Sequence, residues 1–248
     1  MPLQVHQFPC LQDNYGFLLR DQATGQVGCV DTPDAEAILA ELKRLGWSLD
    51  LIMNTHWHPD HAGGNARLQE VTGCQITGPQ EVTRIAPLDR PVTDGDEVML
   101  GETRFQVMDT GGHTLGHITY YDAADAKAFV GDTLFALGCG RVFEGTAEQM
   151  WSSLSRLAAL PDETLVYCAH EYTAANARFA LSVDSSPALK ARAAEVFATR
   201  ERGEPTVPTS IGLEKAANPF LRAPVLRPGE PEAQAFAEVR KAKDVFAG

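Results

Sequence analysis

The chain has 248 residues, of which 44% are hydrophobic, and a formal net charge of −12. This length suits one large domain or a medium domain with a smaller attachment, and the negative charge argues against a nucleic-acid partner. No apolar run approaches the roughly 18 residues of a membrane span. The first ten residues, MPLQVHQFPC, lack the basic and apolar regions of a signal peptide.

The five cysteines are odd in number and widely spaced, a pattern typical of reduced, buried thiols. We therefore expect a cytoplasmic protein without a nucleic-acid or membrane partner, and we expect it to act as a monomer.

The first half of the chain reads mainly as short strands. Asp34 can cap a helix, and Gly46 can end it. Ile38, Leu42 and Leu45 share one face of that helix. Strands are expected at 2–8, 15–20, 26–31, 49–54 and 74–78, and hairpins at 97–110 and 116–132.

The second half becomes helical after His170. Thr146 and Gln149 form a capping box ahead of a helix that Pro161 ends, and 164–170 is the last clear strand. Helices are expected at 171–183, 187–203 and 233–248, and the proline-rich 204–232 is expected to be an ordered loop. We place a domain boundary near 170, which gives domains 1–169 and 170–248.

Charge is divided unevenly across this boundary. Residues 1–169 carry 10 basic and 23 acidic side chains, a net of −13, whereas residues 170–248 carry 11 and 10, a net of +1. Bound metal cations would offset part of the first figure. The last segment is therefore the better place to look for anion binding.

The stretch NTHWHPDHAGG, residues 54–64, holds a dense group of potential ligands directly after an apolar strand. His56 and His58 stand two apart on extended chain and can reach one ion, while Asp60 and His61 can reach a second. Imidazole and carboxylate are usual ligands for zinc, iron and manganese. The alternative is a polar loop with fortuitous histidines.

Three further candidates stand where predicted strands end, so they should converge on one rim: His113, Asp132 and His170. Asp132 has two oxygens and could bridge two ions. The sequence thus predicts His56, His58 and His113 around one metal, Asp60, His61 and His170 around the other, and Asp132 between them.

Four other residues near this set have a simpler interpretation. His6, in the first strand, is expected to be structural. His117 is expected to be a core imidazole, although it could support a ligand. Cys139 and Cys168 could be thiolate ligands but are expected to be buried thiols.

Several motifs of the sequence resemble those of a known family. The motifs THWHPDH, GGHTLGH, GDTLF and CAHEYT resemble the metallo-β-lactamase superfamily. Within it the match is to glyoxalase II, the hydroxyacylglutathione hydrolases, through DNYGFLL, LGCGRVFEGTAEQM, NPFLR at 218–222 and RKAKD at 240–244. The resemblance covers nearly the whole chain.

The resemblance implies an α/β fold, a four-layer αββα sandwich with a catalytic metal-binding domain and a C-terminal helical substrate-binding domain. It implies hydrolysis of the thioester S-D-lactoylglutathione to glutathione and D-lactate, the second step of methylglyoxal detoxification. We expect two divalent metal ions, with zinc favoured and iron or manganese as alternatives. A hydroxide activated by both metals would attack the thioester carbonyl, with Asp60 and Asp132 as the catalytic carboxylates.

The resemblance also implies glutathione contacts. The expected substrate-binding residues are Arg141, Phe143, Tyr172, Arg240 and Lys243. Arg141 stands where the family usually has lysine, which keeps the charge but changes the geometry. Phe143 stands where the family often has tyrosine, so one hydroxyl contact is lost. Gly111 replaces a proline common before the third histidine.

A rival on the same fold is a glutathione persulfide dioxygenase with a single iron. The extended C-terminal region with NPFLR and RKAKD favours the hydrolase. Outside catalysis, a metal-dependent module that captures glutathione conjugates is the remaining alternative.

Overall fold

The computed structural model describes residues 2–247. The chain divides into two compact units. The first is the chain up to Asp109 together with Gly116–Gly131, and the second is Thr110–Leu115 together with the chain from Asp132 on.

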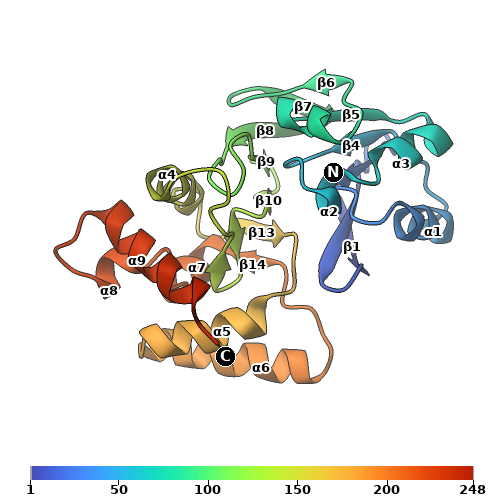
Figure 1. Ribbon diagram of the computed structural model, residues 1–248. Coiled ribbons are helices and arrows are strands. Elements are labelled where there is room, and N and C mark those ends of the chain that lie inside the picture. The colour runs from blue at the N-terminus through green and yellow to red at the C-terminus, as the bar shows by residue number, and fades with distance from the viewer. Residues whose placement is uncertain (1, 248) are drawn as a thin grey trace. The chain divides into compact units, whose positions relative to one another are not determined.

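The first unit contains a six-stranded sheet with helices against it. Strands β1 to β3 pair antiparallel, and β3 to β6 pair parallel in chain order. Helices α1 and α3 lie side by side against this sheet (Figure 1). The bounds are β1 (Gln4–Cys10), β2 (Asn14–Arg20), β3 (Val27–Val30), α1 (Ala35–Leu45), β4 (Leu51–Met53), α2 (Pro59–Ala62), α3 (Asn65–Thr72), β5 (Gln75–Gly78), the 3₁₀ turn η1 (Gln80–Arg84) and β6 (Arg90–Pro91).

Helix α1 begins and ends where the sequence predicts. The Asp34 side chain accepts hydrogen bonds from the backbone N–H groups of Glu36 and Ala37. Gly46 closes the helix at φ 68°, a conformation that glycine adopts without steric cost. Ile38 and Leu42 are buried against the sheet.

A second, antiparallel layer in the same unit comes from β7 (Glu97–Leu100), β8 (Thr103–Asp109), β9 (Ile118–Asp122) and β10 (Lys127–Gly131). These are the two predicted hairpins. Phe129 packs edge-on against both Phe17 and Phe105, with ring centroids 5.9 and 6.2 Å apart. Apolar side chains on β2 and this layer thus join the two sheets, and the helices cover the outer face of the first.

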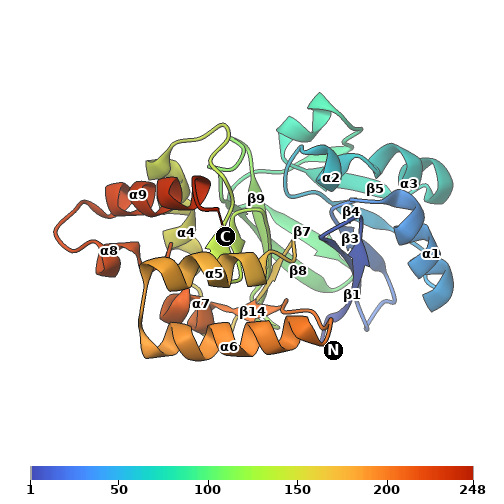
Figure 2. The same cartoon turned by 60° about the horizontal axis from the view of Figure 1, so that its bottom comes forward.

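The second unit is mainly helical. Helices α5 and α6 run side by side (Figure 2) and enclose a small core that includes Leu189 and Val196. Helix α9 packs on α4, where Trp151 contacts Phe236 and donates to Glu232 at 3.1 Å. The bounds are β11 (Leu134–Phe135), β12 (Gly138–Cys139), α4 (Ala147–Ala158), β13 (Leu165–Cys168), α5 (Thr173–Val183), α6 (Pro187–Glu201), β14 (Thr209–Ser210), α7 (Ile211–Ala217), α8 (Ala223–Leu226) and α9 (Glu232–Asp244).

The expectation of an ordered loop at 204–232 is wrong in part. This segment contains β14, α7 and α8. The Ser210 hydroxyl caps α7 by accepting from the Leu213 N–H, and Pro208 and Pro219 flank the helix instead of interrupting it. Proline at these positions ends an element or precedes one, so the high proline content concealed a short helix.

All five cysteines are free and buried, as predicted. In the described residues, no helix combines the length and the apolar character that a membrane span requires.

Candidate metal centre and anion pocket

The histidine-rich stretch follows β4 in the first unit and brings four predicted ligands together. His56 Nε2 lies 3.0 Å from His58 Nδ1, and the rings of His56 and His61 are 4.0 Å apart. Asp60 Oδ2 lies 3.5 Å from His61 Nε2. Because zinc–nitrogen bonds are about 2.0–2.1 Å long, two ligand nitrogens of one ion lie at most about 4.2 Å apart. The spacing of the His56 and His58 nitrogens fits that limit.

Sequence reasoning missed Asp31, which orients this stretch. Its carboxylate lies 2.8 Å from His61 Nδ1 and accepts from the Thr55 backbone N–H at 2.7 Å and the Thr55 hydroxyl at 2.8 Å. This contact directs His61 Nε2 toward Asp60. Asp31 stands at the end of a buried strand, the same signal that singled out Asp132, and could have been found by it.

Other polar contacts fix the ligand backbone and side chains. The Asn14 amide donates to Asp60 Oδ2 at 3.1 Å, and the Asn54 amide donates to the His61 carbonyl at 2.9 Å. His117, expected in the core, is fully buried and stacks on His56 with ring centroids 4.8 Å apart. It therefore packs directly against a predicted ligand.

The remaining three predicted ligands meet in the second unit. His113 Nε2 lies 3.4 Å from Asp132 Oδ2, and His170 Nε2 lies 3.4 Å from Asp132 Oδ1. Each carboxylate oxygen thus faces one imidazole, and all three side chains are buried. His113 Nδ1 lies 2.8 Å from the Arg141 carbonyl oxygen, which holds its other nitrogen toward Asp132.

The two ligand sets have the donors of a metal site. Each unit gathers imidazole nitrogens and carboxylate oxygens, which zinc, iron and manganese accept, and all of these ligands are buried except the partly exposed His58 and Asp60. Four of the seven predicted ligands lie together in the first unit and three in the second. The assignment of each ligand to an ion stays a prediction.

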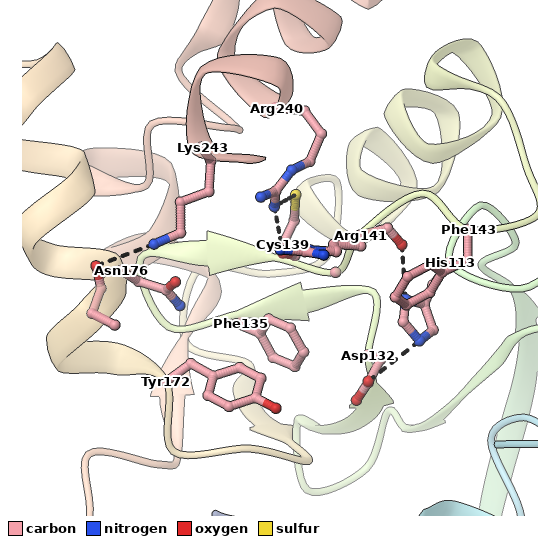
Figure 3. A pocket seen from close by; sticks show the side chains of 12 residues that line it. His113, Asp132, Phe135, Cys139, Arg141, Phe143, Tyr172, Asn176, Arg240 and Lys243 are labelled. Carbon is pink, nitrogen blue, oxygen red and sulfur yellow. Dashed lines mark hydrogen bonds and ion pairs between the residues drawn. The ribbon is translucent and has the colours of Figure 1, made fainter. Parts of the chain in front are cut away.

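A pocket of about 410 Å³ lies in the second unit (Figure 3). His113 and Asp132 lie on one side of it, and Lys243 lies on the other. All five predicted substrate-binding residues line it: Arg141, Phe143, Tyr172, Arg240 and Lys243. The pocket thus adjoins three predicted metal ligands.

Two cations of this pocket, Arg240 and Lys243, are held by different kinds of contact. Arg240 is buried and donates to the Cys139 carbonyl at 3.0 Å and to Asp244 at 2.9 Å. Lys243 lies over the rings of Phe179 and Phe246. Burial, and then the neighbouring Arg240 charge, lower the pKa of the Lys243 ammonium. These groups make a positive pocket in an acidic chain.

Aromatic rings link the pocket to the ligands. Tyr172 stacks on His170 at 4.7 Å with nearly parallel planes, and its ring meets Phe135 edge-on at 5.4 Å. Phe143 is 61% exposed and meets the His113 ring edge-on at 5.2 Å. Phe143 therefore presents an apolar edge where a tyrosine would carry a hydroxyl.

Cys139 and Cys168 do not behave as thiolates. Burial raises the pKa of the Cys139 thiol to about 11 and that of Cys168 to about 12. Cys168 Sγ donates to the His170 carbonyl at 3.8 Å, and Cys139 Sγ accepts from Arg240 at 3.8 Å. These contacts and their burial support the interpretation as buried thiols.

Comparison with known proteins agrees with this arrangement. Residues 27–170 match the description "Metallo-beta-lactamase superfamily", and residues 171–246 match "Hydroxyacylglutathione hydrolase C-terminus". A protein of Maricaulis maris named hydroxyacylglutathione hydrolase is 54% identical over 98% of this chain and 99% of its own length.

Solved structures give the same fold. ETHE1 from Myxococcus xanthus has a TM-score of 0.71 and 30% identity, covering 97% of this chain and 90% of its own. TTHA1623, solved in a di-iron-bound form, has a TM-score of 0.62 and 26% identity, covering 88% and 100%.

The fold and the two donor sets place the chain in the metallo-β-lactamase superfamily, and both imply divalent metal ions. Within that superfamily, the full-length similarity shows that it belongs to the family of hydroxyacylglutathione hydrolases. The predicted α/β metallo-β-lactamase fold with a helical C-terminal segment is confirmed.

Proposed function

We propose that the protein hydrolyses S-D-lactoylglutathione to glutathione and D-lactate. The observation that carries this proposal is the pocket in the second unit, which three cations line together with His113 and Asp132. Its relatives are named hydroxyacylglutathione hydrolases over nearly their full length. The persulfide dioxygenase alternative is not favoured by these names.

We propose that the two ligand sets complete one centre for two divalent metals. His56, His58 and His113 would hold one ion, Asp60, His61 and His170 the other, and Asp132 would bridge them. Zinc is the favoured metal, and the di-iron form of TTHA1623 supports two ions and keeps iron as an alternative. When bound, such ions lower the pKa of water from 15.7 to about 7 and polarise a carbonyl oxygen.

The chain's own residues then bind and orient the substrate. Glutathione carries two carboxylates, which the cations Arg240, Lys243 and Arg141 can bind. Tyr172 would position the substrate beside His170, on which its ring is stacked. The leaving group is a thiolate, so the pocket requires little or no general acid. Asp31 would keep His61 oriented through the reaction.

We also propose that 1–169 is the catalytic metal-binding domain and 170–248 the substrate-binding domain. The two family descriptions meet at residues 170 and 171, which supports this division. Arg141 and Phe143 would then be contributed to the substrate pocket by the catalytic domain. The free cysteines favour a cytoplasmic location, and the monomeric state stays a prediction.

Replacing Asp132 or His58 by alanine tests this function. Each variant should lose bound metal and most thioester cleavage together, because each removes a ligand. The measurement is free-thiol release from S-D-lactoylglutathione, with metal analysis of the same sample. An exposed alanine variant such as Arg67→Ala is the control, and full activity of Asp132→Ala in metal-depleted buffer would contradict the proposal.

A further inference from the structure

The short hairpin of β11 and β12, residues 134–139, connects the predicted metal ligand Asp132 to the substrate pocket. Its two-residue turn is Ala136–Leu137, and Leu137 lies in the left-handed region at φ 56°. Such turns favour glycine or asparagine, because other side chains are disfavoured at positive φ. The turn therefore depends on contacts from outside the hairpin.

Two side chains from the later helical segment bind this turn. The Leu137 N–H donates to Glu214 Oε2 at 2.7 Å, and the Asn176 amide donates to the Ala136 carbonyl at 3.1 Å. Glu214 is fully buried, and Asn176 is 6% exposed. Two of the four backbone polar groups of the turn thus have buried side-chain partners.

Asn218, the first residue of the NPFLR stretch, binds both strands of the hairpin. Its amide donates to the Phe135 carbonyl at 3.2 Å and to the Gly138 carbonyl at 2.9 Å. It also donates to Glu214 Oε2 at 2.9 Å, and it is fully buried. We call Asn176, Glu214 and Asn218 the hairpin clamp.

Glu214 is the centre of the clamp. Besides Leu137 and Asn218, it accepts from the Thr209 hydroxyl at 2.6 Å. Burial raises the pKa of its carboxyl group. A buried acceptor with three donors fixes geometry, because leaving any of those donors without a partner would be costly.

The last residue of the hairpin, Cys139, and Arg141 just after it connect the hairpin to the site. The Cys139 carbonyl accepts from Arg240 at 3.0 Å, and the Arg141 carbonyl lies 2.8 Å from His113 Nδ1. Asp132 lies two residues before the hairpin, with only Thr133 between them. A side chain at Gly140 would collide with the Asp132 carbonyl oxygen, so this part of the backbone allows little displacement.

We infer that Glu214, Asn218 and Asn176 are positioning residues, which set the hairpin so that Asp132, His113 and Arg240 face the pocket together. The inference rests on the proposed function and assigns to the NPFLR stretch a role in that site. None of the three acts on the reacting atoms.

The variants Glu214→Leu and Asn218→Ala test the clamp, and Glu214→Gln is the conservative variant with which they are compared. A glutamine oxygen can still accept from Leu137 and Asn218, and its amide can donate to the Thr209 hydroxyl, so Glu214→Gln should stay within about twofold of the unmodified protein. Glu214→Leu and Asn218→Ala should each raise the Kd for reduced glutathione about 10–100-fold and lower kcat by a similar factor, measured at equal metal content. Exchange of the Leu137 amide hydrogen should also become faster.

Asp184→Ala is the matched control. Asp184 is also buried in the second unit, where it accepts from Arg222, the last residue of the NPFLR stretch, at 3.0 Å and from the Ser186 N–H at 2.8 Å. It contacts none of the three clamp side chains, so it tests whether loosening the NPFLR stretch alone is enough. The Asp184→Ala variant should have a lower melting temperature than the unmodified protein. Its Kd for glutathione, its kcat and the exchange rate of its Leu137 amide hydrogen should be unchanged. If Glu214→Leu fails to fold, Asn176→Ala, which removes one hydrogen bond to the turn, should still make exchange of the Leu137 amide hydrogen faster. Asn176 also lines the pocket, so for this variant the exchange rate and not the Kd is the readout of the clamp.

The inference is overturned if Asn218→Ala and Asn176→Ala match Asp184→Ala in Kd, kcat and amide exchange. It is also overturned if Glu214→Gln raises the Kd for glutathione and lowers kcat as much as Glu214→Leu does. If the unmodified, metal-loaded protein leaves the thioester intact, the proposed function fails instead, and the Leu137 exchange rates still decide on the clamp.

Discussion

At the scale of single residues, the predicted ligands follow from one rule, because acidic and imidazole side chains placed at strand ends converge on one edge. The rule found His113, Asp132 and His170, which the second unit brings together. It applied equally to Asp31, which also ends a buried strand and binds His61, 30 residues later, but was overlooked. Glu214 gave no signal, because its role depends on Leu137, 77 residues earlier.

Of the three pocket cations, Lys243 should respond most to pH. Burial and the Arg240 charge lower the pKa of Lys243, so its positive charge is lost at a lower pH than in an exposed lysine. The KM for S-D-lactoylglutathione should therefore rise as pH increases from neutral through that lowered pKa. Lys243→Arg keeps its charge up to about pH 12 and should delay the rise.

The measurement is KM against pH for both proteins, with the spontaneous hydrolysis of the thioester subtracted. Ionisation of the substrate affects both profiles equally, so their difference reports the side chain. Superimposable profiles would show that Lys243 does not bind the substrate as a cation.

At the scale of elements, prediction succeeded where local signals agree. Asp34, the apolar face with Ile38 and Leu42, and Gly46 all indicate helix α1, and α1 is formed between the two caps. It failed at α7, where the prolines around residues 204–232 outweighed a short helix capped by Ser210. The burial of α7 in the second unit, which a local pattern does not contain, stabilises it.

The Asp34 N-cap of α1 allows a prediction about stability that does not involve the metal ligands or the substrate pocket. Asp34→Ala leaves the N–H groups of Glu36 and Ala37 without this acceptor. It should lower the free energy of unfolding by about 0.5–2 kcal/mol with kcat unchanged. Urea denaturation measures the loss, with exposed Lys43→Ala on the same helix as control. A loss no greater than that of Lys43→Ala would contradict the capping role.

At the scale of the whole molecule, the chain is acidic, with a net charge of −12, yet its proposed substrate is an anion. Three of its 21 basic side chains line one pocket together with His113 and Asp132. Charge counting along the sequence placed anion binding in the last segment, and Arg240 and Lys243 do line that pocket. The contribution of Arg141 depended on family resemblance, because the loop after Asp132 carries no local binding signal.

The central claim is that this chain cleaves a glutathione thioester through its bound metals. The most direct test follows thiol release from S-D-lactoylglutathione by the purified protein before chelation, after chelation, and during stepwise return of zinc. We expect activity to disappear with the metal and to return up to two equivalents of zinc per chain. Unchanged cleavage by verified metal-free protein, or none with two metals bound, would contradict the account.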